Sequence, residues 1–481
     1  MQKSNIKVFS DYKVPKAVLT LALPTMVSML ITVFYNLADT FFVGQTGDAR
    51  QVAAVSVTMP LFFIFLSIGN LFGIGGCAFI SRSVGEGKLD KIKSISSFSI
   101  YSALAIGTIV GLVFIFFRRP ILYLIGASDN TIKFASDYLF FLALGVPFNV
   151  FTLTVGNLIR GEGAAKKSMV GSVIGQVVNI ILDPIFILGT GDKLFGIDMP
   201  FGLGLGATGA AIATVIGNFV SFLYFVIYFT SGKSLLSISI KRYSIKNGIL
   251  KGVVSVGFAA SVNNFLMSLA NIIVNMILVK YGDDVVAAMG IAMKANSFVI
   301  LMQIGMAQGV QPLVGYCYGA KRIERLKKAI KFGIICNVLI GTVITIIFIA
   351  FDRQILEIFI EDVSVVEYGV KMLTPLMTPG PIIGILFILN FSLLGMGKGI
   401  QSLILAVARQ GLIFLPVIII MDRVIGLNGV IWSQPIADFA CILLSVIIFM
   451  QVVIKENKSL NRLDGVQNES WKCSKGTIKS N

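Results

Sequence analysis

The stretch Asn179-Ile180-Ile181-Leu182-Asp183-Pro184-Ile185-Phe186-Ile187-Leu188 places one carboxylate inside a run that is otherwise apolar enough to cross a bilayer. An Asp near the middle of a membrane helix costs about 2.5–3.5 kcal/mol on insertion scales, so such a residue is a candidate for function. Asn179 lies four residues before Asp183 and therefore on the same helical face. Pro184 offers no N–H to the carbonyl of Ile180. These oxygens together favour a site for a cation or a proton. A helix kink whose Asp pairs with a neighbour is the alternative.

The rest of the chain has the composition of a polytopic membrane protein. Of its 481 residues, 56% are apolar and only 13% are charged, and the mean hydropathy is +0.88, values that exclude a soluble enzyme. The net charge of +16 is unevenly distributed. When loops are assigned alternately to two sides, the side with both termini has about 29 of the 40 Lys and Arg residues and the other side about 9. This positive-inside pattern predicts cytoplasmic termini and explains the charge without nucleic acid as a partner.

The sequence contains no histidine. Imidazole metal sites are therefore excluded, and a proton switch near neutral pH has to use carboxylates. The five cysteines show no metal-like spacing and are interpreted as packing residues. No phosphate-binding loop, zinc-protease helix or nucleophile elbow occurs, so we expect neither an enzyme nor an ATP-driven pump, and no cofactor.

Twelve apolar segments of spanning length follow one another, six on each side of a polar, basic stretch. The fold class predicted from this pattern is an all-α polytopic membrane protein with twelve transmembrane helices. We expect an N-lobe over residues 1–230, a cytoplasmic linker over 231–251, a C-lobe over 252–454 and a polar cytoplasmic tail over 455–481.

The two halves repeat each other. With one constant shift, Gly85 falls on Gly319 and Gly161 falls on Gly395. Since each half has six helices, both halves enter the membrane from the same side, and the repeats are parallel ones related by an axis along the membrane normal. Two such lobes predict a central cleft and alternating access. Duplication without transport is the alternative.

Five further stretches are grouped by what they resemble: Leu23-Pro24, Tyr35-Asn36-Leu37-Ala38-Asp39-Thr40, Leu158-Ile159-Arg160-Gly161-Glu162-Gly163, Gly209-Ala210-Ala211-Ile212-Ala213-Thr214 and Gly315-Tyr316-Cys317-Tyr318-Gly319-Ala320-Lys321. Together with residues 179–184, they resemble the multidrug and toxic compound extrusion (MATE) family, in particular the bacterial branch that includes DinF and MepA. The resemblance runs from about Ala17 to Val453. It implies V-shaped lobes around the cleft and export of lipophilic cations in exchange for inward H⁺ or Na⁺.

The resemblance also implies a coupling-ion site in the N-lobe, made by Tyr35, Asp39, Tyr138, Asn179, Asp183 and Thr214. If Na⁺ is the coupling ion, the implied ligands are Asp39, Asn179, Asp183 and Thr214. Pro24 is the implied bend in the first helix, and Asn157 lies in a similar cleft-facing stretch. Residue counts alone place Asp39 and Asp183 in the outer half of the bilayer. If they are close, two like charges in a low dielectric are expected to share protons.

The C-lobe holds a different set of charges. Lys294, Arg409 and Asp438 all fall at mid-depth by residue count. A lone cation there is costly, so Asp438 is expected to compensate Arg409, Lys294 or both. A role in helix packing and a role in transport both stay open.

Methionines are candidates for the lining of a drug cavity, because thioethers repack around varied ligands. Met26 and Met289 represent this group. A place in the core or against lipid is the alternative for each.

These observations predict a secondary-active multidrug and cation antiporter in the bacterial cytoplasmic membrane. We expect lipophilic cationic drugs and dyes as substrates, membrane lipids as surroundings, a monomer, and no cofactor besides the coupling ion. A flippase of lipid-linked sugars from the same superfamily is the alternative. A cleft for phosphates would be expected to hold more cations, whereas Asp39 and Asp183 favour a cationic substrate.

Overall fold

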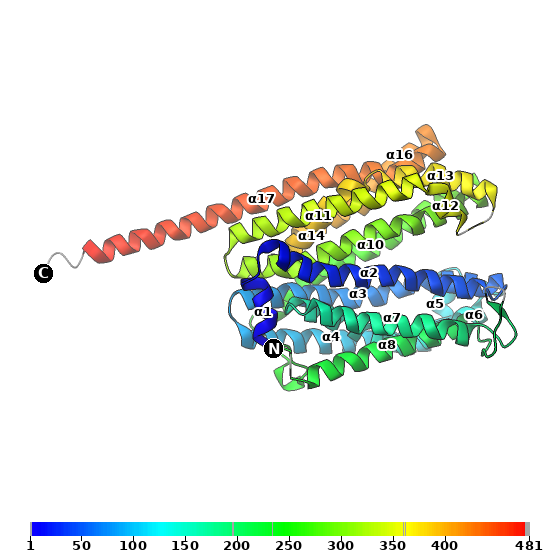
Figure 1. Cartoon of the computed structure of the whole chain (residues 1–481), viewed down its shortest axis with the longest axis horizontal. Helices are drawn as coiled ribbons and strands as arrows, with labels where there is room; N and C mark the ends of the chain where they lie inside the picture. Colours follow the sequence, from blue (N-terminus) through cyan, green and yellow to red (C-terminus); the bar gives the residue numbers. More distant parts are fainter. Residues whose placement is uncertain (1, 195–196, 233, 359, 361, 477–481) are drawn as a thin grey trace.

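The computed structural model describes residues 2–194, 197–232, 234–358, 360 and 362–476. The described part of the chain is helical except for loops and one antiparallel hairpin, in which β1 (Lys193–Leu194) pairs with β2 (Ile197–Asp198). Figure 1 shows two bundles of roughly parallel helices, one from the blue-to-green first half and one from the green-to-red second half.

The first bundle and the segment that follows it contain α1 (Gln2–Ser10), α2 (Val14–Gly44), α3 (Ala49–Gly85), α4 (Leu89–Phe116), α5 (Arg118–Leu124), α6 (Ile132–Gly161), α7 (Ala165–Ile187), α8 (Ala207–Thr230) and the 3₁₀ turn η1 (Ile240–Arg242). The second contains α9 (Ile249–Leu278), η2 (Val279–Tyr281), α10 (Asp283–Gly319), α11 (Ile323–Ala350), α12 (Asp352–Glu357), α13 (Val363–Met377), α14 (Gly380–Gly395), α15 (Gly399–Val407), the π-helical turn η3 (Ala408–Ile413), α16 (Phe414–Ile425) and α17 (Leu427–Gly476).

Hydropathy and length make most of these helices membrane spans. Among the described residues, eleven helical segments are long and apolar enough to cross a bilayer, counting α15, η3 and α16 as one. The pair α13 and α14, bent by 49° at its break, makes a twelfth. The break falls next to Pro379, which cannot donate a helical hydrogen bond. The prediction of an all-α membrane protein with twelve spans is confirmed.

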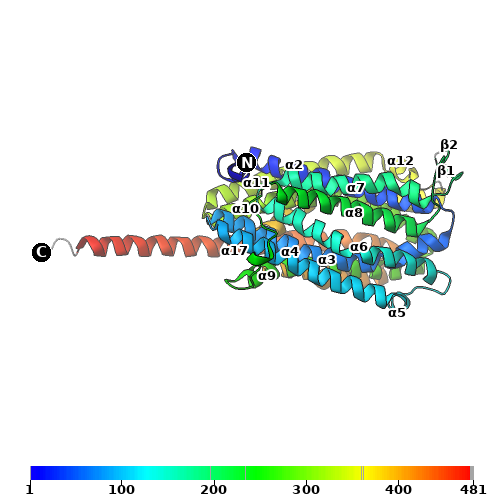
Figure 2. The ribbon, with the colours of Figure 1, turned by 90° about the horizontal axis from the view of Figure 1, so that it is seen from below.

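The two ends of the molecule differ. Figure 2 shows α1 at the end from which α17 projects, and the β1–β2 hairpin at the opposite end. The chain passes from α8 to α9 at the α1 end. α17 continues as a helix through Gly476, so it includes most of the polar tail predicted from residue 455.

The lobes pack tightly against each other through α3. A Cβ built on Gly85 would lie 2.2 Å from the carbonyl oxygen of Tyr316 in α10, and one built on Gly257 in α9 would lie 1.7 Å from the carbonyl oxygen of Leu71. Only glycine allows backbones to approach this closely. One buried apolar cluster therefore runs through both lobes, with Phe72 and Val253 among its members.

The amino-terminal helix α1 lies over this junction. Phe9 is fully buried, and its ring stacks on Tyr316 with centroids 5.2 Å apart. The carbonyl of Tyr12 accepts a hydrogen bond of 2.6 Å from Arg325 Nη2. Tyr316 thus touches α1 through its ring and lies against α3 through its carbonyl, so the lobes are closed at the end where α1 lies.

Candidate functional site

Three helices of the first lobe, α2, α7 and α8, meet around Asp183, and α6 packs beside them. The crossing of α7 and α8 is close because glycines face each other. A Cβ on Gly175 would lie 2.4 Å from the carbonyl oxygen of Gly217, and one on Gly217 would lie 3.2 Å from Cβ of Asn179. This approach places the next polar side chain of α8, that of Thr214, against Asn179.

Thr214 Oγ1 connects two of these helices directly to α8. Asn179 Nδ2 donates a hydrogen bond of 3.2 Å to it. The hydroxyl of Tyr35 on α2 lies 3.4 Å from the same oxygen, and either group can donate. The structure therefore brings Tyr35, Asn179 and Thr214 together, from segments far apart in the sequence.

The oxygens that lack partners are those suited to a cation. Both carboxylate oxygens of Asp183 are buried without a hydrogen-bond partner among the described residues, and so are Asp39 Oδ1 and Asn179 Oδ1. Asp183 is 0% exposed and Asn179 only 2%. Burying a carboxylate without a partner is unfavourable. A group in this state has the chemistry to accept a proton or a small hard cation.

Asp39 and Tyr138 complete the cluster. Asp39 is half-buried on α2, one turn after Tyr35, and Tyr138 is buried on α6. The charges of Asp39 and Asp183 lie within electrostatic range of each other and of both phenol groups. All six residues implied as the coupling-ion site thus belong to one region of the first lobe.

Gln176 and Thr32 extend the polar cluster, and sequence reasoning did not assign them to it. Gln176 Nε2 donates a hydrogen bond of 2.7 Å to Thr32 Oγ1, while Gln176 Oε1 is buried without a partner. The spacing along α7 could have predicted Gln176 as a member of the cluster, because Gln176 lies three residues before Asn179 and seven before Asp183. Residues three and seven apart share one face of a helix.

Asn157, expected in a cleft-facing stretch, lies in a part of α6 distant from the two acids. Asn157 Oδ1 accepts a hydrogen bond from Arg160, and Asn157 Nδ2 donates to the carbonyl of Leu153 at 2.8 Å. By residue count it lies five turns from Tyr138 along α6. Its side chain is thus hydrogen-bonded within α6, well away from the acids.

Pro24 and the two methionines have packing environments. The helix α2 runs unbroken through Pro24. Met26 is buried where α2 meets α10, since a Cβ on Gly305 would lie 2.9 Å from its Cα. Met289 is buried in the apolar cluster of the C-lobe.

The charges of the C-lobe form a closed pair. Arg409 Nε donates a hydrogen bond of 2.8 Å to Asp438 Oδ1, and Gln434 Nε2 donates one of 2.9 Å to the same oxygen. The guanidinium of Arg409 lies over the ring of Phe387, 5.4 Å from its centroid. Lys294 is exposed and forms no ion pair among the described residues. Asp438 thus pairs with Arg409, and Arg409 lies in the π-helical turn η3.

A third buried acid, Glu162, lies in the turn between α6 and α7. It is 0% exposed and accepts hydrogen bonds from Tyr228 Oη at 2.8 Å, Ser234 Oγ at 2.9 Å and the N–H of Leu235 at 2.7 Å. Burial raises the pKa of Glu162 to about 7, although these donors lower it in part. Apart from the position of Glu162 in a glycine-rich turn, nothing in the sequence indicated that this carboxylate is buried and hydrogen-bonded.

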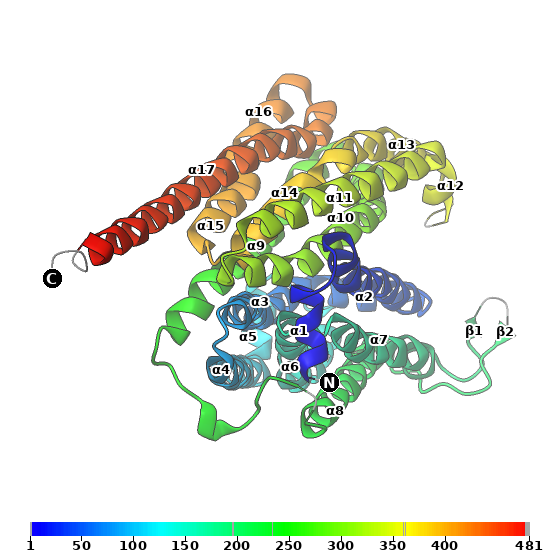
Figure 3. The same ribbon diagram turned by 60° about the vertical axis from the view of Figure 1, so that its left-hand side comes forward.

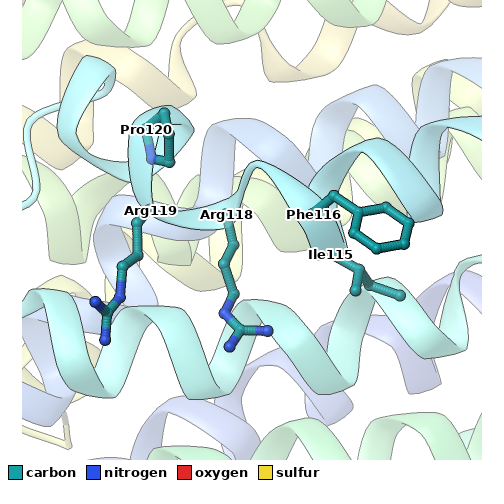
Figure 4. A pocket seen from close by; sticks show the side chains of 5 residues that line it. All are labelled: Ile115, Phe116, Arg118, Arg119 and Pro120. Atoms are coloured by element: carbon teal, nitrogen blue, oxygen red, sulfur yellow. The ribbon is translucent and has the colours of Figure 1, made fainter.

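A surface hollow at the turn from α4 to α5 has a different character. Figure 4 shows the side chains of Ile115, Phe116, Arg118, Arg119 and Pro120 around it. Its charged groups are two guanidinium groups, and that of Arg118 lies 5.1 Å from the ring centroid of Phe140. This lining does not suit a cation.

Comparisons with known proteins agree with this geometry. The MatE family model matches the chain twice, at residues 24–185 and 259–420, once in each half. The multidrug export protein MepA of Staphylococcus saprophyticus is 34% identical over 448 residues, which cover 93% of this chain and 96% of that protein. MepA of Staphylococcus aureus strain MSSA476 is 33% identical over the same shares.

Solved structures share the fold. A crystal structure of MATE in complex with MaL6 superposes with a TM-score of 0.88 at 23% identity, covering 94% of this chain and 99% of that one. An outward-facing multidrug resistance MATE transporter of the MOP superfamily gives a TM-score of 0.85 at 24% identity, covering 94% and 98%. The twofold match to one family model and the relatives that align along nearly the whole chain establish a multi-pass transporter, not an enzyme. The chain is a member of the multidrug and toxic compound extrusion family.

Proposed function

We propose that this protein is a secondary-active antiporter that exports lipophilic cationic compounds in exchange for inward H⁺ or Na⁺. The observation that supports this proposal most is the set of buried carboxylate and amide oxygens without partners on α2 and α7. Asp183, Asp39, Asn179 and Thr214 supply enough oxygen for a small cation or for a shared proton. The names of the relatives, which are multidrug export proteins, support the substrate class.

Exchange follows from competition for one negative charge. The coupling ion stabilises the carboxylates of Asp39 and Asp183. A cationic drug that approaches them stabilises the same two groups. Binding of one therefore lowers the affinity for the other, and this reciprocity is the least that an exchanger requires. Pro24 has no N–H to donate within the continuous helix α2, so one helical hydrogen bond is missing there and α2 is the proposed moving part.

The proposed location is the bacterial cytoplasmic membrane, with both termini in the cytoplasm and the protein acting as a monomer. The α1 end is then the cytoplasmic end, and it is the end where the lobes are closed by Gly85, Gly257 and Phe9. The acids lie towards the opposite end of α2 and α7. This arrangement fits a state in which the site faces outward, ready to release a drug and accept an ion.

Energy decides the direction of transport. A potential that is positive outside opposes export of a cation by about 2.3 kcal/mol per charge per 100 mV. Export of a monovalent cation therefore needs at least one inward ion in each cycle. Uptake of a fluorescent cation into inverted vesicles, with pH and Na⁺ gradients imposed separately, should require one of the two gradients. Uptake that persists with ATP present after both gradients have collapsed would contradict the antiporter.

The C-lobe charges favour the antiporter over a flippase of lipid-linked sugars. Asp438 neutralises Arg409, so this buried cation is already paired and is not offered to a phosphate. Among the described residues, the carboxylates with buried oxygens that lack a hydrogen-bond partner are those of Asp39 and Asp183. Neither carboxylate would attract an anionic substrate.

A further inference from the structure

The segment between α8 and α9 is held against the side of α4 by hydrogen bonds between side chains of α4 and backbone groups of the segment. Ser96 Oγ both accepts from the N–H of Ser237, at 2.9 Å, and donates to its carbonyl, at 3.1 Å. Tyr101 Oη donates to the carbonyl of Ile238 at 2.6 Å. Figure 3 shows this green segment passing around the outside of α4 on its way to α9. The connection between the lobes is therefore an ordered part of the first lobe.

The depth of this contact on α4 is informative. The charged residues of α4 are Asp90, Lys91 and Lys93, and every residue from 94 to 116 is uncharged. The segment contacts α4 at Ser96 to Ser102, beyond the last of these charges. At a rise of 1.5 Å per residue, Tyr101 lies about 18 Å from the first residue of α4. The segment thus runs beside the helix where its membrane-spanning part begins.

The segment exposes large apolar side chains at this depth. Ile240 is 60% exposed, Tyr243 42%, Ile245 54% and Leu250 48%. Tyr243 is oriented by α4, because its ring lies 5.8 Å from that of Phe98 and its hydroxyl lies 3.4 Å from Ser102 Oγ. Leu250 lies in the first turn of α9 and the other three precede that helix. Apolar side chains grouped where a spanning helix begins are a common feature of surfaces that bind a membrane interface.

Cations alternate with these apolar side chains. Lys241, Arg242, Lys246 and Lys251 are all exposed. No Asp or Glu occurs between residues 231 and 251. A basic segment with interleaved apolar side chains at the cytoplasmic boundary of a membrane matches the chemistry of anionic lipid headgroups above acyl chains.

We propose that residues 240–251 form a docking surface for anionic lipids of the cytoplasmic leaflet. Ile240, Tyr243 and Ile245 enter the boundary between headgroups and acyl chains, while Lys241, Arg242 and Lys246 bind the lipid phosphates. Because Ser96 and Tyr101 fasten the preceding residues to α4, docking holds the start of the inter-lobe connection at the leaflet surface. This surface is separate from the coupling-ion site and from the drug that is carried.

A tryptophan in the segment tests the proposal. Ile245 is exposed and forms no hydrogen bond or ring contact among the described residues, so I245W is a mild change. Replacing Trp432 and Trp471 by Phe leaves it as the only tryptophan. The protein is reconstituted in phosphatidylcholine vesicles that contain either brominated phosphatidylglycerol or brominated phosphatidylcholine at equal mole fraction. We expect quenching by the anionic lipid to be stronger by roughly twofold or more at low salt, and the difference to shrink at high salt.

Two quadruple variants in this background separate the specific surface from general positive charge. K241Q/R242Q/K246Q/K251Q should make quenching by the two lipids equal. K166Q/K167Q/K328Q/K331Q removes the same charge from exposed lysines outside the segment and should preserve the preference. Equal quenching of the parent protein by both lipids would overturn the proposal, as would absence of quenching by either. A preference that survives the first variant would also overturn it.

Discussion

Each lobe buries acidic side chains, but the two lobes treat them in opposite ways. In the first lobe, Asp183 is fully buried, and neither of its oxygens has a hydrogen-bond partner in the described part of the chain. In the second, Asp438 is 4% exposed and accepts hydrogen bonds from Arg409 and Gln434. The same residue type in the same kind of helix is thus left open in one half of the repeat and closed in the other.

The difference separates exchange from packing. In a buried ion pair whose hydrogen bonds are satisfied, each charge is already neutralised by its partner. Removal of one partner costs about 3–5 kcal/mol. A buried carboxylate without a partner is unfavourable by itself, so any proton or cation that reaches it is stabilised. We infer that the first lobe carries the coupling chemistry and that the Arg409–Asp438 pair holds helices together.

The largest effect is expected for neutralising the open acids. D183N should lower gradient-driven dye efflux by roughly 100-fold or more, because the site loses the charge for which ion and drug compete. D39N should do nearly the same. Neither variant should lower the thermal stability in detergent, since each removes a buried charge without a partner. E357Q, which changes an exposed carboxylate in α12, serves as the control and should transport normally. Normal efflux in D183N would contradict the proposal that the first lobe carries the coupling chemistry.

Neutralising the closed acid should have the opposite profile. D438N leaves Arg409 buried without its counter-charge, which should lower the free energy of unfolding by about 3–5 kcal/mol. R409Q added to D438N should recover part of the loss, and thermal unfolding of the four members of this cycle in detergent measures the coupling. Purely additive losses would mean that the pair does not contribute as a unit.

Glu162 sharpens the comparison, because it is a satisfied acid within the first lobe. Burial raises the pKa of its carboxyl group to about 7, above its ordinary value of 4.5. The folded protein then binds this proton more tightly than the unfolded chain, so the free energy of unfolding should fall as pH rises from about 4.5 to about 7. E162Q should remove this part of the pH dependence, on the order of 1–3 kcal/mol. Melting temperatures of both proteins across this range test it, and parallel curves would show that Glu162 does not titrate there.

Removal of one hydroxyl group from the coupling-ion site should weaken ion binding without abolishing it. T214V keeps the shape of the side chain but removes the oxygen that Asn179 and Tyr35 share. Loss of one such hydroxyl is worth about 0.5–1.5 kcal/mol, so the apparent affinity for the coupling ion should weaken by about 2- to 12-fold. Ion titrations of drug release measure this shift. An unchanged affinity would exclude Thr214 from the site.

The fold could be predicted from hydropathy, because a membrane helix makes its backbone hydrogen bonds within its own segment. Each spanning segment can therefore be identified from its own residues. Pairings between spans were less accessible. Residue counts put both Lys294 and Arg409 at the depth of Asp438, and the contacts between helices then make Arg409, which lies in η3, the partner. The bonds of the Asn157 side chain to Arg160 and Leu153 along α6 were not predicted either.

Contacts between distant segments explain what was missed. The bond from Tyr228 to Glu162 depends on how α8 packs beside α6, and the bond from Ser234 depends on how the inter-lobe segment returns over the first lobe. No local pattern encodes either contact. Asp183 was visible because a lone carboxylate in an apolar run is conspicuous without any partner.

The most direct test of an open first lobe is ion release from purified protein. Addition of a lipophilic cation to the detergent-solubilised protein in weakly buffered solution should release H⁺ or Na⁺, detected with a pH-sensitive dye or a sodium electrode. The double variant D39N/D183N should release neither, while D438N/R409Q, which changes the closed pair, should release the ion as the unmodified protein does. Normal release from D39N/D183N would contradict the account and would place the coupling ion elsewhere.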